Sequence, residues 1–326
     1  MVVSTNVPDC IERVAQFVHE KQLIIPQSLV VIGLSGGPDS VFLLHALIAL
    51  QPTYQHQLIA AHLNHEWRAS AIDDERLCQK LCDSLDIPLI SARASQLAYQ
   101  PHKTGSKEDI GRQLRRFFFQ DVMRTHNAQH IALAHHADDQ LETFFIRLIR
   151  GAHIAGLASI RPVQQAYIRP LLFLHKHEIL DYLHKHNIHY AIDPTNSCSD
   201  FLRNRIRADL IPTLTAIDQR APHNIKKAIA HLQETDSFLN RLACTAFEKL
   251  CLEGGTTIDI NTLFELDPTL QKLVIMRWLF HNKITHSPSS STIEEIMRFF
   301  RHTQSAEHRI GSFYITKKKH HATIRL

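Results

Sequence analysis

A glycine turn between an apolar run and a helical segment is the feature that most constrains this chain. Residues 35–40 read SGGPDS, the apolar run Leu29–Ile32 precedes them, and a helix-like segment at 41–45 follows. In that context, backbone N–H groups and the positive end of the helix dipole bind phosphate. The glycines permit positive φ angles and a close approach of the backbone to a ligand. The turn therefore predicts a nucleotide site.

Each residue type in the turn has a use in such a site. Serine hydroxyls donate hydrogen bonds to phosphate oxygens, and Asp39 offers a carboxylate to Mg²⁺. No lysine follows the glycines, which excludes the G-x-x-x-x-G-K-S/T loop. The alternative is a strand-to-helix turn whose serines only cap the helix. The residues predicted to bind the nucleotide here are Ser35, Gly36, Gly37, Pro38, Asp39 and Ser40.

The composition is typical of a soluble globular protein. A chain of 326 residues with 44% hydrophobic content predicts two domains. We expect neither a signal peptide nor a membrane span, and therefore a cytoplasmic protein, because Asp9, Glu12 and Arg13 interrupt the apolar N-terminus and no later apolar run is long enough. The six cysteines include no C-x-x-C pair, which argues against zinc and iron–sulfur sites. The net charge of +4 permits a nucleic-acid partner without requiring one.

Strand and helix patterns alternate along the first part of the chain. This alternation predicts an α/β fold with a doubly wound, mainly parallel sheet, whose ligands bind beyond the carboxyl ends of the strands. We assign residues 1–217 to this catalytic domain. After a helix near 10–21, the expected strands are 28–34, 57–63, 87–91 and 130–134, and the expected helices are 41–50, 71–84, 107–126, 139–149 and 175–187.

Helical patterns dominate residues 218–326, which we assign to a smaller, mostly helical domain. It contains basic residues but no constellation of acids, bases or metal ligands, so we expect it to recognise a partner rather than to catalyse. The expected helices are 222–252, 268–282 and 291–302, the expected strands are 308–316 and 320–326, and the basic residues include Lys226, Lys227 and the turn Lys317–Lys319.

Two polar segments end strands at the same predicted edge of the sheet, AHLNH at 61–65 and AHHADD at 134–139. Asp139 and Glu142 fit a helix cap and its reciprocal partner, which is a purely structural use. That interpretation does not explain His135 and Asp138, which suit a site for Mg²⁺ and polyphosphate. We predict catalytic roles for His135 and Asp138, with Asp39 and Asp138 as the metal ligands.

Arginines cluster in two further segments, GRQLRR at 111–116 and RNRIR at 203–207. On a helix, Arg203 and Arg207 share a face and Arg205 points elsewhere. A solvated basic face is the alternative for any one of them. As a set beside a phosphate site they favour anion recognition.

These segments together resemble the tRNA(Ile)-lysidine synthetase family, which belongs to the PP-loop or N-type ATP pyrophosphatases. The resemblance covers nearly the whole chain, and the C-terminal part, around Arg277–Leu279 and 310–313, resembles the family's first C-terminal domain. Larger members carry a second C-terminal domain, which this sequence does not reach. The matching segments are SGGPDS, AHLNHEWR at 61–68, GRQLRR, AHHADDQLET at 134–143, RGAHIAGL at 150–157, RPLL at 169–172, DPTN at 193–196 and RNRIR.

The resemblance implies a reaction and its partners. ATP and Mg²⁺ activate O2 of the wobble cytidine in the CAU anticodon of an isoleucine tRNA, and free L-lysine then displaces AMP at C2 to give lysidine. A homodimer is compatible with the sequence. The resemblance implies a catalytic role for Arg112, nucleotide contact for His62, and substrate contact for Asn64, His65, Arg115, Asp139, Glu142, Arg203, Asn204, Arg205 and Arg207.

The chain departs from the family pattern at a few positions. His153 replaces a usual glycine, Arg116 a common tyrosine, Gly111 a usual alanine and Cys198 a frequent aspartate. Two other functions compete with the reaction above. A PP-loop tRNA thiolase would need cysteine ligands, and a tRNA-binding protein without activity would not need Asp39, His135 and Asp138.

Overall fold

The computed structural model describes residues 9–68, 70–101, 107–191, 202–284, 289–302, 306–310 and 313–325. The predicted turn at 193–196 and Cys198 lie outside these residues. The chain divides into two compact units, Met1–Ile229 and Ala230–Leu326. In the part of the chain that is described, no helix has the length and apolar character needed to cross a membrane.

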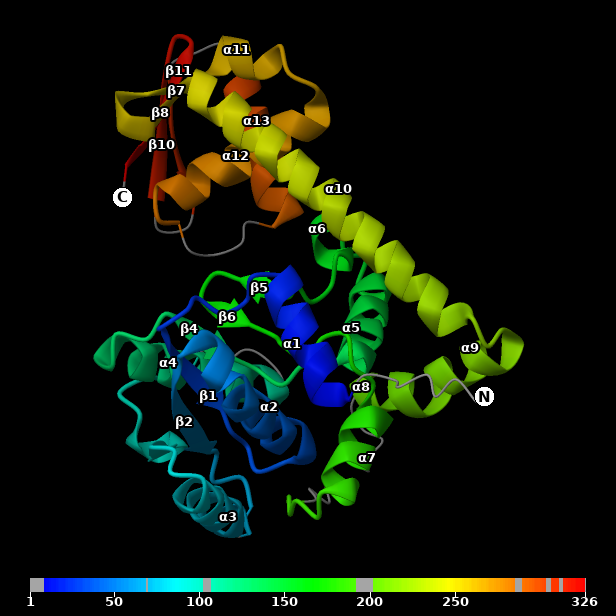
Figure 1. Ribbon diagram of the computed structural model, residues 1–326. Helices are drawn as coiled ribbons and strands as arrows, with labels where there is room; N and C mark the ends of the chain where they lie inside the picture. Colours follow the sequence, from blue (N-terminus) through cyan, green and yellow to red (C-terminus); the bar gives the residue numbers. More distant parts are fainter. Residues whose placement is uncertain are drawn as a thin grey trace. The chain divides into compact units, whose positions relative to one another are not determined.

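Unit 1 is built on a six-stranded sheet with the order β3-β2-β1-β4-β6-β5 (Figure 1). All neighbouring strands run parallel except β5, which pairs antiparallel with β6. The order reverses at β1, so the predicted doubly wound sheet is confirmed. The strands are β1 (Leu29–Gly33), β2 (Gln57–Asn64), β3 (Leu89–Arg93), β4 (His130–Ala132), β5 (Val163–Gln164) and β6 (Tyr167–Ile168).

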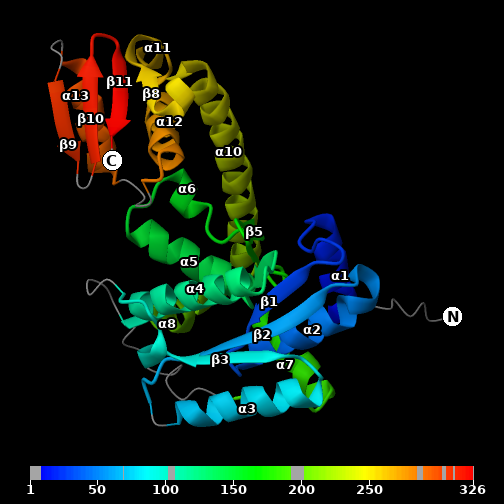
Figure 2. The same ribbon diagram turned by 90° about the vertical axis from the view of Figure 1, so that its left-hand side faces the viewer.

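Helices bury both faces of this sheet. One face packs against α1 (Cys10–Glu20), α2 (Pro38–Tyr54), α3 (Ala71–Ser84) and α7 (Lys176–Lys185), with Phe42 at the centre of the core. The other face packs against α4 (Lys107–Thr125), whose side chains meet inward residues of β1 and β2. Figure 2 shows α3 and α4 on opposite sides of the strands. Because both faces are covered, the strands read as continuous apolar runs.

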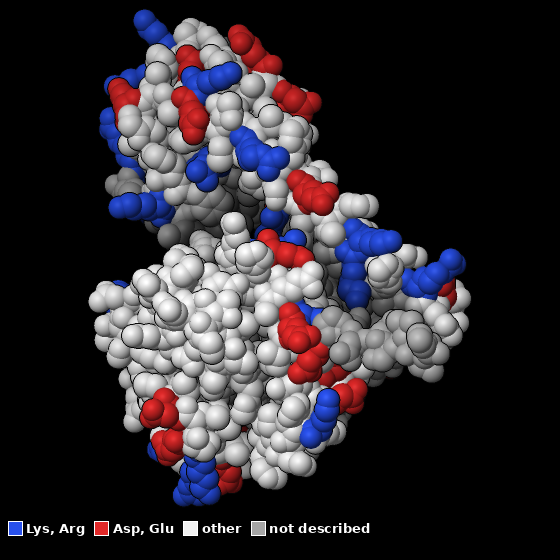
Figure 3. Space-filling view, in the orientation of Figure 1, with Lys and Arg blue, Asp and Glu red and all other residues white. Residues whose placement is uncertain are grey.

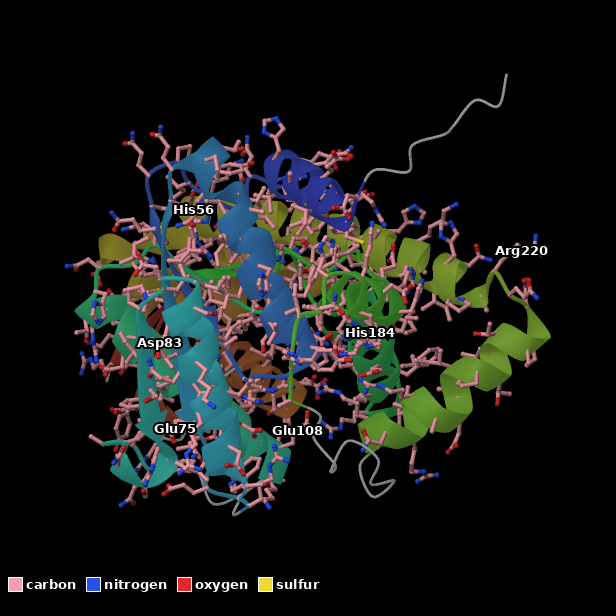
Figure 4. All side chains as sticks on the ribbon, turned by 60° about the horizontal axis from the view of Figure 1, so that its bottom comes forward. His56, Glu75, Asp83, Glu108, His184 and Arg220 are labelled. Atoms are coloured by element: carbon pink, nitrogen blue, oxygen red, sulfur yellow. The ribbon has the colours of Figure 1, made fainter. Side chains whose placement is uncertain are left out.

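The carboxyl edge of the sheet receives the loops that carry the predicted site. Figure 4 shows His56, which precedes β2, at one edge of the sheet, and Glu75 and Glu108 toward the opposite one. The remaining helices of unit 1 follow these loops. They are α5 (Ala137–Ile149), α6 (Ile154–Leu157), α8 (Leu202–Arg205), a π-helical turn at Ile206–Leu210, α9 (Ile211–Ile217) and the start of α10 (Ala221–Leu250).

The division between the units falls inside α10, after Ile229. From the sequence we place the boundary near residue 217, which is the end of α9. The structure therefore assigns the first turns of α10 to unit 1. This matters for Lys226, which the predicted boundary places in the recognition domain.

Unit 2 combines helices with a five-stranded antiparallel sheet of order β7-β8-β11-β10-β9. Its core surrounds Trp278, which is fully buried and donates its indole N–H to the carbonyl of Thr256 at 3.2 Å. Lys, Arg, Asp and Glu side chains are interspersed on the face of this unit in Figure 3. Its further elements are β7 (Cys251–Leu252), β8 (Thr257–Asp259), α11 (Ile260–Phe264), α12 (Pro268–His281), α13 (Ser290–Arg301), β9 (Ala306–Ile310), β10 (Phe313–Lys318) and β11 (His321–Arg325).

Lys317 points into unit 2 rather than toward a partner. Its side chain is 5% exposed, and its ammonium donates to the carbonyl oxygens of Phe300 at 2.6 Å and of His302. These are carbonyls at the carboxyl end of α13, which have no partner inside the helix. Burial lowers the pKa of Lys317. Of the lysine turn, Lys318 and Lys319 remain exposed.

We expect Lys317→Ala to lower the free energy of unfolding by about 2 kcal/mol, because it leaves buried carbonyls at the end of α13 without a donor. Lys319→Ala is the matched control, and it should change stability by no more than about 0.5 kcal/mol. Chemical denaturation followed by circular dichroism measures both. Equal effects of the two substitutions would show that Lys317 does not cap α13.

Candidate functional site

The predicted phosphate loop joins β1 to α2 in the expected conformation. Gly36 has φ +81°, and a Cβ there would lie 3.3 Å from the Cys78 sulfur. The Ser40 hydroxyl donates to the Gly37 carbonyl at 2.9 Å and accepts from the Ser35 N–H at 3.1 Å. These bonds fold the loop around the first turn of a 17-residue helix. The loop therefore presents a helix N-terminus of the kind that binds anions.

The carboxylates of Asp39 and Asp138 are held by the first residues of α7. The Lys176 ammonium lies 2.6 Å from Asp39 Oδ1, and the Lys176 backbone N–H donates to Asp138 Oδ2 at 3.0 Å. The second oxygen of Asp138 lies 2.9 Å from His175 Nδ1. Burial alone would raise the pKa of Asp138, but these two hydrogen bonds, together with the nearby His136 and His175, lower the pKa overall. Asp138 is thus ionised and anchors α7.

His136 lies among three carboxylates. Its ring nitrogens are 3.9 Å from Asp39, 3.7 Å from Asp138 and 3.6 Å from Asp139. The His136 backbone N–H donates to Asp139 Oδ2 at 3.0 Å, so His136 caps α5 and Asp139 is its reciprocal partner. The predicted cap at Asp139 with Glu142 as its partner is therefore wrong by one turn, because α5 begins at Ala137. The three aspartates are therefore brought together at the ends of β1 and β4.

The donor set fits Mg²⁺ that arrives with a nucleotide. Within the described ranges, no group of three or more His, Cys, Asp or Glu residues is arranged to hold a metal. Mg²⁺ commonly uses one or two carboxylates and completes its octahedron with phosphate oxygens and water. Asp39 is placed to supply one such oxygen beside the phosphate loop. Asp138 already accepts hydrogen bonds at both oxygens, so its role as a metal ligand stays a prediction.

Glu142 forms a buried ion cluster with the arginines of the RNRIR segment. Its carboxylate is 0% exposed, with Arg207 Nε at 2.6 Å and Arg203 Nε at 3.5 Å. Arg203 also donates to Glu108 on α4 at 2.8 Å. Burial raises the pKa of Glu142, and the hydrogen bond from Arg207 opposes that rise. Arg203 and Arg207 both contact Glu142, which agrees with the predicted shared helix face. Glu142 is a buried residue of the protein itself rather than an external anion.

His135 is influenced electrostatically by Arg203 of this cluster and by Arg169 and Arg112. Burial lowers its pKa well below the usual range; Asp139 opposes this, and the positive charges of Arg169 and Arg112 add to the lowering. The imidazole is therefore neutral at physiological pH and can offer a ligand a hydrogen bond but no charge. Arg112 is exposed and lies 3.7 Å from Glu108.

The predicted residues at the end of β2 bond mainly to the protein itself. His62 and Asn64 are 4% and 5% exposed; His62 Nδ1 lies 2.9 Å from the Leu34 carbonyl, and the Asn64 amide donates to Glu75 at 3.2 Å. His65 stacks on Trp67 with ring centroids 4.5 Å apart, and burial, helped by Arg115, lowers the His65 pKa to about 4. Their predicted ligand contacts stay predictions.

The side chains of Arg115 and Arg205 are exposed, and Asn204 is half-buried.

Two departures from the family pattern have a physical explanation. His153 has φ −74°, an angle that any residue adopts, and the positive φ of that loop falls on Gly151. A Cβ on Gly111 would lie 2.4 Å from the Trp67 ring, so the glycine accommodates the indole.

Sequence reasoning missed four basic or polar residues near the site: His175, Lys176, Arg169 and Lys226. Arg169 is 8% exposed, donates to the Arg161 carbonyl at 2.8 Å, and has its pKa lowered to about 10, first by burial and then by the charges of Arg112 and Arg147. One sequence feature could have indicated His175 and Lys176: they form a basic pair at the start of the predicted helix that follows the RPLL segment.

The buried neutral histidines predict a loss of stability in acid. His65 and His135 bind protons less readily in the folded state than in the unfolded one, so the free energy of unfolding should fall as the pH drops below about 6.5. His65→Gln should remove about 2 kcal/mol of that fall between pH 7 and pH 4. Denaturation midpoints across this range measure it, and the exposed His126→Gln is the control. An unchanged slope for His65→Gln would mean that His65 binds protons equally readily in the folded and unfolded states.

A family model described as "PP-loop domain" matches residues 7–214. Among curated proteins, the tRNA(Ile)-lysidine synthase of Bacillus cereus is 32% identical over 305 residues, which are 90% of this chain and 64% of that protein. The Bacillus subtilis protein of that name is 33% identical, over 88% of this chain and 62% of the relative. The Geobacter sulfurreducens protein is 36% identical, over 78% and 55%. The chain thus spans less than two thirds of these relatives.

Among solved structures, a U34-tRNA thiolase from Methanococcus maripaludis superposes with a TM-score of 0.58 at 19% identity, covering 69% of this chain and 78% of that one. At that identity the similarity concerns the fold. The phosphate loop, the strand order and the family match over residues 7–214 agree with one another. The chain therefore belongs to the PP-loop family.

Proposed function

We propose that this chain uses ATP to join free lysine to C2 of the wobble cytidine in an isoleucine tRNA with a CAU anticodon, forming lysidine. The observation that carries the proposal is the meeting of the phosphate loop, Asp39 and the His135–Asp139 segment at one sheet edge. It is supported by the 32% identity to a tRNA(Ile)-lysidine synthase over 90% of the chain. The product would pair with A and change aminoacylation from methionine to isoleucine.

In the first step, O2 of the cytidine attacks the α-phosphorus of ATP and the bond to the bridging oxygen breaks, which releases pyrophosphate. The loop Ser35–Ser40 holds the phosphates through backbone N–H groups and the α2 dipole. Mg²⁺, when bound through Asp39, would neutralise phosphate charge. Neutral His135 donates a hydrogen bond to a phosphate oxygen, and Arg112 supplies positive charge from the exposed side of α4. The cytidine must leave its stack to reach this point.

In the second step, the ε-amine of lysine attacks C2 and AMP leaves with the C2–O bond electrons. The side chain of free lysine arrives as an ammonium, which must lose a proton before its nitrogen can attack. A carboxylate therefore has to bind the ammonium first. Asp139 suits this role, because its carboxylate side chain is 17% exposed and lies beside His135 and His136. Glu142 is fully buried against Arg203 and Arg207. It would position those arginines and tune the charge around Asp139.

A PP-loop thiolase is the second candidate. Such an enzyme needs reactive cysteines. Cys78 and Cys82 are buried, and burial raises their pKa values to about 12 and 11, so both thiols stay protonated. The described cysteines are unpaired, at positions 10, 78, 82, 244 and 251. The residues that the structure describes therefore favour ligation over sulfur transfer.

The deciding experiment incubates isoleucine tRNA with ATP and each amino acid in turn, followed by mass analysis of the tRNA. We expect a mass increase with lysine only, together with pyrophosphate release that depends on a CAU anticodon. Asp39→Asn should keep the fold and lose most of this activity, because a neutral amide is a poor Mg²⁺ ligand. Normal pyrophosphate release by folded Asp39→Asn would remove Asp39 from the metal site. A mass increase with a sulfur donor would favour the thiolase.

Arg205 and Arg207 form a matched pair for separating RNA contact from internal support. Arg205 is exposed, so Arg205→Ala should lower the salt dependence of tRNA binding by about one unit of slope and leave stability unchanged. Arg207→Ala should instead lower the free energy of unfolding by about 2 kcal/mol, because it strips a hydrogen bond from the buried Glu142. Filter binding at several salt concentrations and chemical denaturation measure the two effects. The reverse pattern would place Arg207 on the RNA.

A further inference from the structure

One residue at the start of α7 contacts both carboxylates predicted to bind metal. The side-chain ammonium of Lys176 lies 2.6 Å from Asp39, and its backbone N–H lies 3.0 Å from Asp138. Asp39 belongs to the first turn of α2, directly after the phosphate loop. Lys176 therefore places a cation on the aspartate that directly follows the phosphate loop.

The backbone of Lys176 is fixed by a relay of hydrogen bonds. Lys226 Nζ lies 2.8 Å from His175 Nε2, and His175 Nδ1 lies 2.9 Å from Asp138. Because an ammonium can only donate, His175 accepts at Nε2 and carries its proton at Nδ1, which donates to Asp138. His175 and Lys226 thus act as positioning residues that keep Asp138, and with it the first turn of α7, in place.

The side chain of Lys176 is less constrained than its backbone. Its ion pair with Asp39 is partly exposed, with side-chain exposures of 34% and 27%. Pairs at this exposure contribute little to stability. A lysine side chain has a flexible four-carbon stem, so its ammonium can move by several ångströms while the backbone stays anchored. Breaking the Lys176–Asp39 pair therefore costs little free energy, and the pair lies beside the phosphate loop. The ammonium of Lys176 is thus suited to exchange Asp39 for another anion.

We propose that Lys176 is a phosphate-binding residue of the nucleotide site. Its ammonium rests on Asp39 in the nucleotide-free protein, and it binds oxygens of the β- and γ-phosphates when a nucleotide occupies the loop. Asp39 would then be available to hold Mg²⁺. During the first step it stays on the departing pyrophosphate, which leaves with the electrons of the broken phosphorus–oxygen bond, and Lys176 keeps its own protons. This assignment deepens the proposed function and rests on it.

The test measures binding rather than turnover, on the full chain without tRNA. The variants are Lys176→Gln and Lys176→Arg, with Lys185→Gln, an exposed lysine in the last turn of α7, as the matched control. Calorimetry measures the affinity for pyrophosphate and for ATP in the presence of Mg²⁺. Electron paramagnetic resonance measures Mn²⁺ binding to the nucleotide-free protein. Circular dichroism checks that each variant is folded.

We expect Lys176→Gln to weaken pyrophosphate binding about tenfold, because it removes one charge-assisted hydrogen bond. The same variant should bind Mn²⁺ more tightly, because no ammonium competes for Asp39. Lys176→Arg should keep most of the pyrophosphate affinity, and Lys185→Gln should match the wild type. Weaker binding of pyrophosphate together with tighter binding of Mn²⁺ distinguishes a phosphate-binding role of Lys176 from a purely structural ion pair.

Pyrophosphate affinity in Lys176→Gln that equals the wild-type value overturns the proposal, and the pair with Asp39 is then structural only. Weaker pyrophosphate binding without tighter Mn²⁺ binding overturns the resting position of the ammonium on Asp39. If the wild-type protein binds neither ATP nor pyrophosphate, the proposed function fails together with this inference. If the wild type binds both and the variant binds them equally well, only this inference fails.

Discussion

The paired charges at the carboxyl edge of the sheet determine how the rest of unit 1 is arranged there. Asp138 on α5 binds the start of α7 through His175 and Lys176. One turn later on α5, Glu142 binds Arg203 and Arg207. Each carboxylate would be costly to bury alone, and each is satisfied only when a segment far along the chain docks. The same contacts that complete the fold therefore assemble the candidate site.

Elements with a local signal could be predicted from the sequence. The helix predicted at 71–84 coincides with α3, and the strand predicted at 57–63 lies within β2. The phosphate loop was recognisable because glycine, serine and a strand-to-helix transition occupy consecutive positions. Apolar periodicity and turn chemistry are encoded within about ten residues, so a single sequence suffices for them.

Features that depend on distant partners could not be predicted in this way. Strands β5 to β8 are two or three residues long, too short for an apolar pattern. Nothing near Lys317 indicates that its ammonium caps α13, and nothing near Lys176 points to Asp39. From the sequence alone, a lysine in a basic run is predicted to be solvent-exposed. Only the tertiary structure shows whether a carbonyl or a carboxylate oxygen accepts its hydrogen bonds. The inward orientation of Asn64 is hidden for the same reason, because Glu75 lies on the next helix.

The departures from the family pattern show how such distant contacts constrain single positions. Gly111 and Trp67 belong to different elements, yet a methyl group on residue 111 would overlap the indole. Lys107 also lies over the Trp67 ring, 5.0 Å from its centroid, so the first turn of α4 packs around this side chain. Since α4 carries Arg112 and Arg115, the indole influences where those guanidinium groups project. A change at residue 67 would therefore act on the candidate site through the position of α4, without any contact to a ligand.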